Sequence, residues 1–162
     1  QFTFIERIGV SISIENQSLS NIMLIASLLG IPGSMVCIIV GNKYGLLPPF
    51  LFGTFCCLFG MSILIMEKTY ITYALRMCLI GFGWSIALPY IQSHLASIDK
   101  KGSALAAGNS FATIGAAVGA AIGASLIGQT SNYNMLLQVS ILIYIFAVLL
   151  IITSIGIRKF RS

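Results

Sequence analysis

Arg76 is a charged residue inside a long apolar stretch, where an ionisable side chain needs a physical reason. Such a residue within a membrane costs several kcal/mol and usually faces a protein interior or a water-filled cavity. At 100° per residue along a helix, Trp84 lies at the margin of the face that carries Arg76. The members of that face are Tyr73, Arg76, Ile80, Gly83, Ala87 and Tyr90. We favour a cavity wall or an interhelical role, and the alternative is an arginine that snorkels to the outer interface.

Glu6 and Arg7 form a second pair of ionisable residues, near the beginning of the chain. Neighbours in a helix point about 100° apart, so we do not expect these two side chains to pair with each other. Two interpretations stay open. One of the residues faces the path of a solute, or both lie at the headgroups on the outer surface.

The residue types for catalysis or metal binding are sparse. His94 is the single histidine, and one histidine without clustered carboxylates does not make a metal site of the usual composition. The cysteines form no C-x-x-C pair and read as small hydrophobic residues; they are Cys37, Cys56, Cys57 and Cys78. No nucleophile lies beside an evident base. We therefore expect no metal, no cofactor and no enzymatic activity.

The composition selects the class of protein. Of the 162 residues, 57% are hydrophobic and 8% are charged, whereas a soluble domain carries about 25% charged residues. So little polar surface excludes a soluble domain, a disordered chain and a nucleic-acid binder. It predicts an integral membrane protein whose partner is the lipid bilayer.

Long apolar runs between the charges predict where the chain crosses the bilayer, since a spanning helix needs about 20 such residues. The runs lack the alternation of barrel strands, so the fold class is an all-α polytopic membrane helix bundle. The residues before Ile8 read as the end of a truncated helix, and Gln1 in place of an initiator methionine indicates a fragment. Short connections predict one membrane domain over 1–162. The expected spans are 17–41, 49–66, 70–92, 104–127 and 136–156.

The distribution of lysine and arginine predicts the orientation, because these residues collect on cytoplasmic loops. Six lie on one side of the expected spans, against Arg7 and Lys68 on the other. We expect a multi-pass protein of the cell (inner or plasma) membrane with a cytoplasmic C-terminus. The net charge of +5 is then an orientation signal. The six are Lys43, Lys100, Lys101, Arg158, Lys159 and Arg161.

The expected span 104–127 carries a stripe of small residues. Its glycines are Gly108, Gly115, Gly119 and Gly123, and alanines lie beside them. Small residues at a spacing of four let helix backbones approach closely in a membrane. We predict that this face packs against another helix.

The loop from Gly41 to Pro48 (GNKYGLLP) resembles the D-R/K-x-G-R-R signature of the major facilitator superfamily. Asn42 takes the acidic position, Lys43 the basic position and Gly45 the glycine, whereas leucines replace the last two basic residues. The pair Leu75-Arg76, followed by Gly81-Phe82-Gly83, is similar to the R-x-x-Q-G motif of the fourth and tenth helices of that family, with a spacing from Arg76 to Gly81 that is one residue longer and with no glutamine. The loop at 99–102 and the glycine-rich run after it resemble the family's eleventh helix and the loop before it.

The resemblance implies the C-terminal half of such a transporter, from the end of the seventh helix to the twelfth. In the family the seventh and tenth helices line the substrate cavity. That would place Glu6, Arg7 and the Arg76 face, with Tyr73, Trp84 and Tyr90, along the substrate path. The eighth and eleventh helices of the family pack against the other half, so the missing N-terminal half of the same chain would be a partner.

The function expected on these grounds is secondary active transport of a small solute by alternating access, with a proton or another ion as a candidate for coupling. Arg76 hints at an anionic or polar solute, but an interhelical role fits it equally. The residues 1–162 alone would lack half of the cavity and would not transport. The alternative function is a membrane scaffold or assembly subunit that does not transport and uses the glycine-rich helix as its contact.

Overall fold

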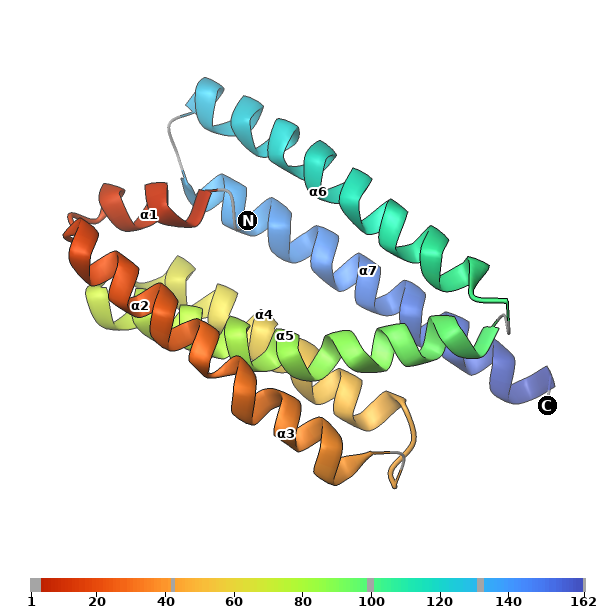
Figure 1. Cartoon of the computed structure of the whole chain (residues 1–162). Helices are drawn as coiled ribbons and strands as arrows, with labels where there is room; N and C mark the ends of the chain where they lie inside the picture. Colours follow the sequence, from red (N-terminus) through yellow and green to blue (C-terminus); the bar gives the residue numbers. More distant parts are fainter. Residues whose placement is uncertain (1–3, 42, 99–100, 131–132, 162) are drawn as a thin grey trace.

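The computed structural model describes residues 4–41, 43–98, 101–130 and 133–161, and within them it contains helices and turns but no strand. This confirms the all-α bundle. The helices are α1 (Ile5–Ser11), α2 (Asn16–Leu28), α3 (Gly30–Val40), α4 (Leu47–Met66), α5 (Tyr70–Ile98), α6 (Ser103–Thr130) and α7 (Tyr133–Arg161). The long helices run side by side and alternate in direction (Figure 1).

Within the described residues, five helical stretches are long and apolar enough to cross a membrane: Asn16–Val40, Leu47–Met66, Tyr70–Ile98, Ser103–Gly128 and Tyr133–Gly156. The third runs past the expected end at Gln92, because the polar residues that follow contain neither glycine nor proline and do not stop a helix. The short α1 precedes these stretches. It continues to Ser11 rather than ending before Ile8.

The first span consists of α2 and α3 and is interrupted at Leu29. Pro32 has no backbone N–H and cannot donate to the carbonyl of Leu28, four residues earlier. The helical hydrogen bonding of this span is therefore broken near its middle.

A second proline, Pro89 inside α5, similarly frees the carbonyl of Ser85. The Cys37 thiol of α3 points at this group, with its sulfur 3.7 Å from the Ser85 oxygen and 3.5 Å from the Ile86 oxygen. Freed backbone groups in membrane helices are re-satisfied by neighbouring helices. Cys37, which the sequence presents as a small hydrophobic residue, thus links α3 to the proline site of α5.

A close contact between helix backbones joins α4 to α5. A Cβ atom added to Gly53 would lie 2.6 Å from the Gly83 carbonyl oxygen and 2.9 Å from the Ala87 backbone nitrogen. One added to Gly60 would lie 3.3 Å from the Arg76 carbonyl oxygen. The helices can lie this close only because these positions have no side chain.

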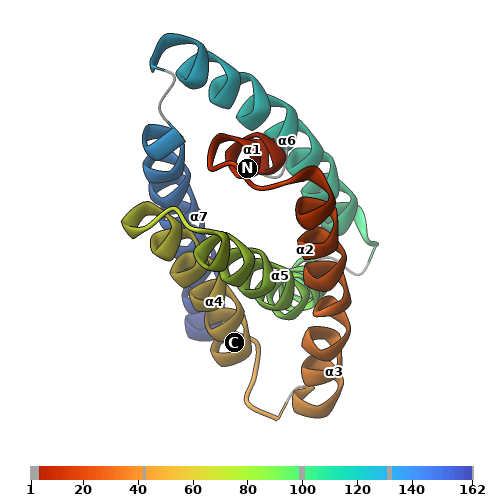
Figure 2. The same ribbon diagram turned by 90° about the vertical axis from the view of Figure 1, so that its left-hand side faces the viewer.

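Helix α6 contrasts with this pair. It runs along the outer edge of the bundle (Figures 1 and 2), and most of its described residues are exposed. Gly123 is its one buried residue within the part whose side chains the structure describes. The fold therefore combines a tightly packed α4–α5 pair with a largely uncovered α6.

The α4–α5 contact predicts the effect of one added methyl group. Gly53→Ala should lower the free energy of unfolding by about 1–3 kcal/mol, because overpacking forces the backbones apart. Gly115→Ala on α6 is the matched control: its Cβ meets nothing within 4 Å, and alanine is a better helix former than glycine. Unfolding by dodecyl sulfate in mixed micelles measures both. Equal stability of the two variants would show that the α4–α5 contact does not limit the stability of the fold.

Candidate functional site

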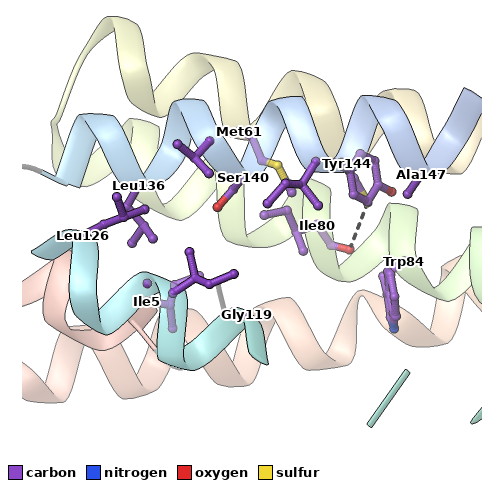
Figure 3. A pocket seen from close by; sticks show the side chains of 15 residues that line it. Ile5, Met61, Ile80, Trp84, Gly119, Leu126, Leu136, Ser140, Tyr144 and Ala147 are labelled. Carbon is purple, nitrogen blue, oxygen red and sulfur yellow. Dashed lines mark hydrogen bonds between the residues drawn. The ribbon is translucent and has the colours of Figure 1, made fainter. Parts of the chain in front are cut away.

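A pocket of about 300 Å³ is bounded by five helices. Ile5 of α1 closes one side, Met61 of α4 and Ile80 of α5 another, and α6 and α7 complete the wall (Figure 3). Gly119 on α6 lines it, and a Cβ added there would meet nothing within 4 Å. The absence of a side chain at this position thus contributes to the open space.

Most of the pocket wall is aliphatic, and its polar atoms come from four residues. Trp84 of α5, which is 41% exposed, borders the pocket, and Ser140 and Tyr144 reach it from α7 (Figure 3). Cys57 of α4 also lines it, and its thiol points at the Ile80 carbonyl at 3.9 Å. No lysine, arginine, aspartate or glutamate of the described chain belongs to this wall.

The pocket lies near the middle of the spanning helices. Ile80 is about 15 Å along α5 from Tyr70, and Tyr144 is about 16 Å along α7 from Tyr133, at a rise of 1.5 Å per residue. The hydrocarbon core of a bilayer is about 30 Å thick. If each helix enters the core near its first residue, these side chains lie close to the midplane.

Of the six residues expected along a substrate path, Trp84 alone belongs to this pocket. Tyr73 is fully buried, and its hydroxyl donates a hydrogen bond to the Ile5 carbonyl oxygen at 3.0 Å. The same ring lies beside Gly9. Tyr73 therefore fastens the short α1 to α5.

Arg76 is also fully buried, with 0% of its surface exposed. Its backbone lies against Gly60 of α4, and it is not part of the pocket wall. The side chain is enclosed by the bundle, which agrees with the interhelical interpretation. Arg76 therefore lies between helices and does not line the pocket.

Tyr90 lies toward the opposite end of α5 and is likewise outside the pocket. Its hydroxyl donates a hydrogen bond to the Gly41 carbonyl oxygen at 3.1 Å, in the loop that resembles a transporter signature. Gly41 has a φ of +46° and Gly45 a φ of +75°, a region that favours glycine. Lys43 is exposed, and Asn42 lies outside the described residues.

Glu6 and Arg7 are both exposed on α1. They border a second, shallow hollow together with Val10, Ser11 and Tyr133. That hollow shares no lining residue with the pocket between the five helices. The structure thus does not bring Glu6 or Arg7 together with Trp84.

The four glycines of α6 have different surroundings. A Cβ on Gly108 would lie 2.6 Å from a methyl carbon of Leu95 on α5, and Gly123 contacts Phe4 and Leu136. Gly115 meets nothing within 4 Å, and Gly119 borders the pocket. Within the described chain these glycines do not bring α6 against another helix along a continuous stripe.

The contributions of α4 and α7 to the pocket were not among the expectations from the sequence. Ser140 and Tyr144 are four residues apart, so they share one face of α7. They are polar residues in a strongly apolar span, and this signal was present in the sequence. That Cys57 and Met61 lie opposite them is a tertiary feature that no local pattern carries.

Comparisons with known proteins identify no relative: no protein-family model matches the chain, and no curated protein or solved structure matches it.

The Tyr73 hydrogen bond predicts a local effect on α1. Tyr73→Phe should lower the free energy of unfolding by about 0.5–1.5 kcal/mol, the usual net value of such a bond, and should speed amide exchange in α1. Tyr70→Phe is the control, since Tyr70 is exposed on the same helix and its hydroxyl forms no hydrogen bond in the described chain. Hydrogen-exchange mass spectrometry would contradict the assignment if α1 exchanged equally fast in the two variants.

Proposed function

We propose that this chain is part of a secondary active transporter that moves a small solute by alternating access. The pocket between α1, α4, α5, α6 and α7 carries the proposal. Substrate sites of secondary transporters lie near the bilayer midplane, between helices that can rearrange. A small-molecule site is a mostly apolar hollow with a few polar groups, and this pocket has that composition.

The family we propose is the major facilitator superfamily, on the strength of the loop from Gly41 to Pro48. The positive φ angles of Gly41 and Gly45 give a physical reason for two of its glycines. The uncovered face of α6 is suited to contact the N-terminal half that the resemblance implies. In this proposal the solute is accompanied by a proton or another ion.

The exposed small-residue face of α6 also favours a second function, that of a membrane scaffold that does not transport. Gly115 and its neighbours could receive a helix of another subunit. A scaffold needs no access to the pocket from either side of the membrane, which distinguishes the two proposals.

We further propose that the protein lies in the cell (inner or plasma) membrane with its C-terminus in the cytoplasm. The ends of α3 and α5 lie at the same end of the bundle as the C-terminus (Figure 1). The loop after α3 carries Lys43, and Lys101 precedes α6. The bias of cations toward this end supports the orientation.

Reporter fusions test this orientation. A green fluorescent protein fused after Ser162 should fluoresce, and an alkaline phosphatase fused at the same place should be inactive, because the first matures in the cytoplasm and the second outside it. Alkaline phosphatase inserted after Lys68, in the α4–α5 connection, is the control and should be active. The reverse pattern would overturn the assignment.

Alternating access predicts that the pocket opens to each side in turn. In the full-length protein, Ser140→Cys should react with a membrane-impermeant methanethiosulfonate reagent in both right-side-out and inside-out vesicles. The readout is labelling above that of the parent protein, which corrects for its own cysteines.

Leu142→Cys is the matched control, because Leu142 is on the same helix, is 67% exposed and does not line the pocket. It should react from neither side if it faces lipid. Labelling of Ser140→Cys from one side only, or from neither, would favour the scaffold over the transporter.

A further inference from the structure

We infer that the pocket takes a neutral, mainly apolar molecule with an aromatic ring and a hydrogen-bonding group, rather than an anion. The pocket is the one described above, between α4, α5, α6 and α7, with α1 closing one side. The statement that the bound molecule is cargo rests on the proposed transport function. The statement that the pocket binds such a molecule does not depend on that function.

The wall supplies no charged side chain that would balance an ionic solute. The wall contains no charged residue of the described chain, and Arg76, the charge in the spanning part of α5, lies between helices outside it. An ion that left water for this pocket would lose its hydration without gaining a counter-charge. The arginine that hints at an anionic solute in the sequence therefore does not select the ligand here.

The polar atoms of the wall define what the pocket can recognise. Trp84 presents part of its indole, against which an aromatic ring can stack or pack edge to face. Ser140 forms no hydrogen bond in the part of the chain that the structure describes, so its hydroxyl is available as a donor or an acceptor. Tyr144, one turn further on, interacts with the Cys57 thiol.

The size of the pocket limits the ligand. Its volume of about 300 Å³ lies at the small end of the range for small-molecule sites. One molecule with two or three aromatic rings matches that volume. A lipid acyl chain would fill the space but would leave the Ser140 hydroxyl without a partner, so we commit to an aromatic solute.

The probe for this inference is N-phenyl-1-naphthylamine, which is neutral, has three aromatic rings and carries one N–H group. Its matched anion is 8-anilinonaphthalene-1-sulfonate, the same skeleton with a sulfonate. Energy transfer from Trp84 to the probe is measured with the full-length protein in phosphatidylcholine nanodiscs. The specific signal is the part of the energy transfer that is lost in the Trp84→Phe variant.

The neutral probe should give a saturable signal, and the sulfonate should give none. Gly119→Leu, which places a side chain in the pocket, should weaken binding by at least about tenfold. Leu142→Phe, at an exposed position of α7 that does not line the pocket, should leave binding unchanged. Ser140→Ala should weaken it by about threefold to tenfold, the value of one net hydrogen bond. Because Ser140→Ala is a conservative substitution, it also keeps the inference testable if Gly119→Leu fails to fold.

A signal that is equal in Gly119→Leu and Leu142→Phe would mean that the probe resides in the lipid, which overturns the inference. Saturable binding of the sulfonate in preference to the neutral probe would overturn it as well. Binding of the neutral probe, when Ser140→Cys is not labelled from both sides of the membrane, would reject transport but support the ligand class. Labelling of Ser140→Cys from both sides without probe binding would support transport but reject the ligand class.

Discussion

The close approach of α4 and α5 at Gly53 and Gly83 is the contact on which the other helix positions depend. A bilayer gives apolar helices little hydrophobic reason to associate, since lipid tails are as apolar as leucine side chains. Packing, hydrogen bonds and small residues have to supply the attraction instead. The contact between these glycine backbones meets that requirement at the centre of the bundle. Helix α5 then holds the first span in the same manner, through Gly81 against Ala26 and Gly33 against the Phe82 backbone.

The pocket follows from the uneven distribution of this packing. One side of it is formed by α4 and α5, whose backbones cannot separate without breaking the glycine contacts. Another side is formed by α6, which is largely exposed and has Gly119 where a side chain would otherwise fill the space. An interior packed throughout as tightly as the α4–α5 crossing would leave no room of this size. The hollow is therefore located where tight packing gives way to loose packing.

The sequence predicted the helical class because that information is local. A run of apolar residues between charges is visible without any partner, and lipid allows only a helix or a closed barrel. The packing partners were harder to find. The regular glycines of 104–127 were conspicuous, yet the tight contacts between helix backbones belong to Gly53, Gly81 and Gly83 on other helices. A small residue permits close approach, but which helix approaches is decided by the whole bundle. Arg76 shows the same limit: an interior position could be expected, whereas its separation from the pocket could not.

The position of the pocket also bears on how a ligand could move the protein. A ligand shifts a conformational equilibrium only by binding one state more tightly than another. A molecule in this pocket would contact Ile80 or Trp84 of α5 on one side and Gly119 of α6 on the other. Displacing α5 breaks its glycine contacts with α4, whereas displacing the exposed α6 gives up much less buried surface. If binding changes the shape of this bundle, α6 is therefore the helix that moves, and its small residues are those that would pack against the ligand or against α5 as the pocket closes.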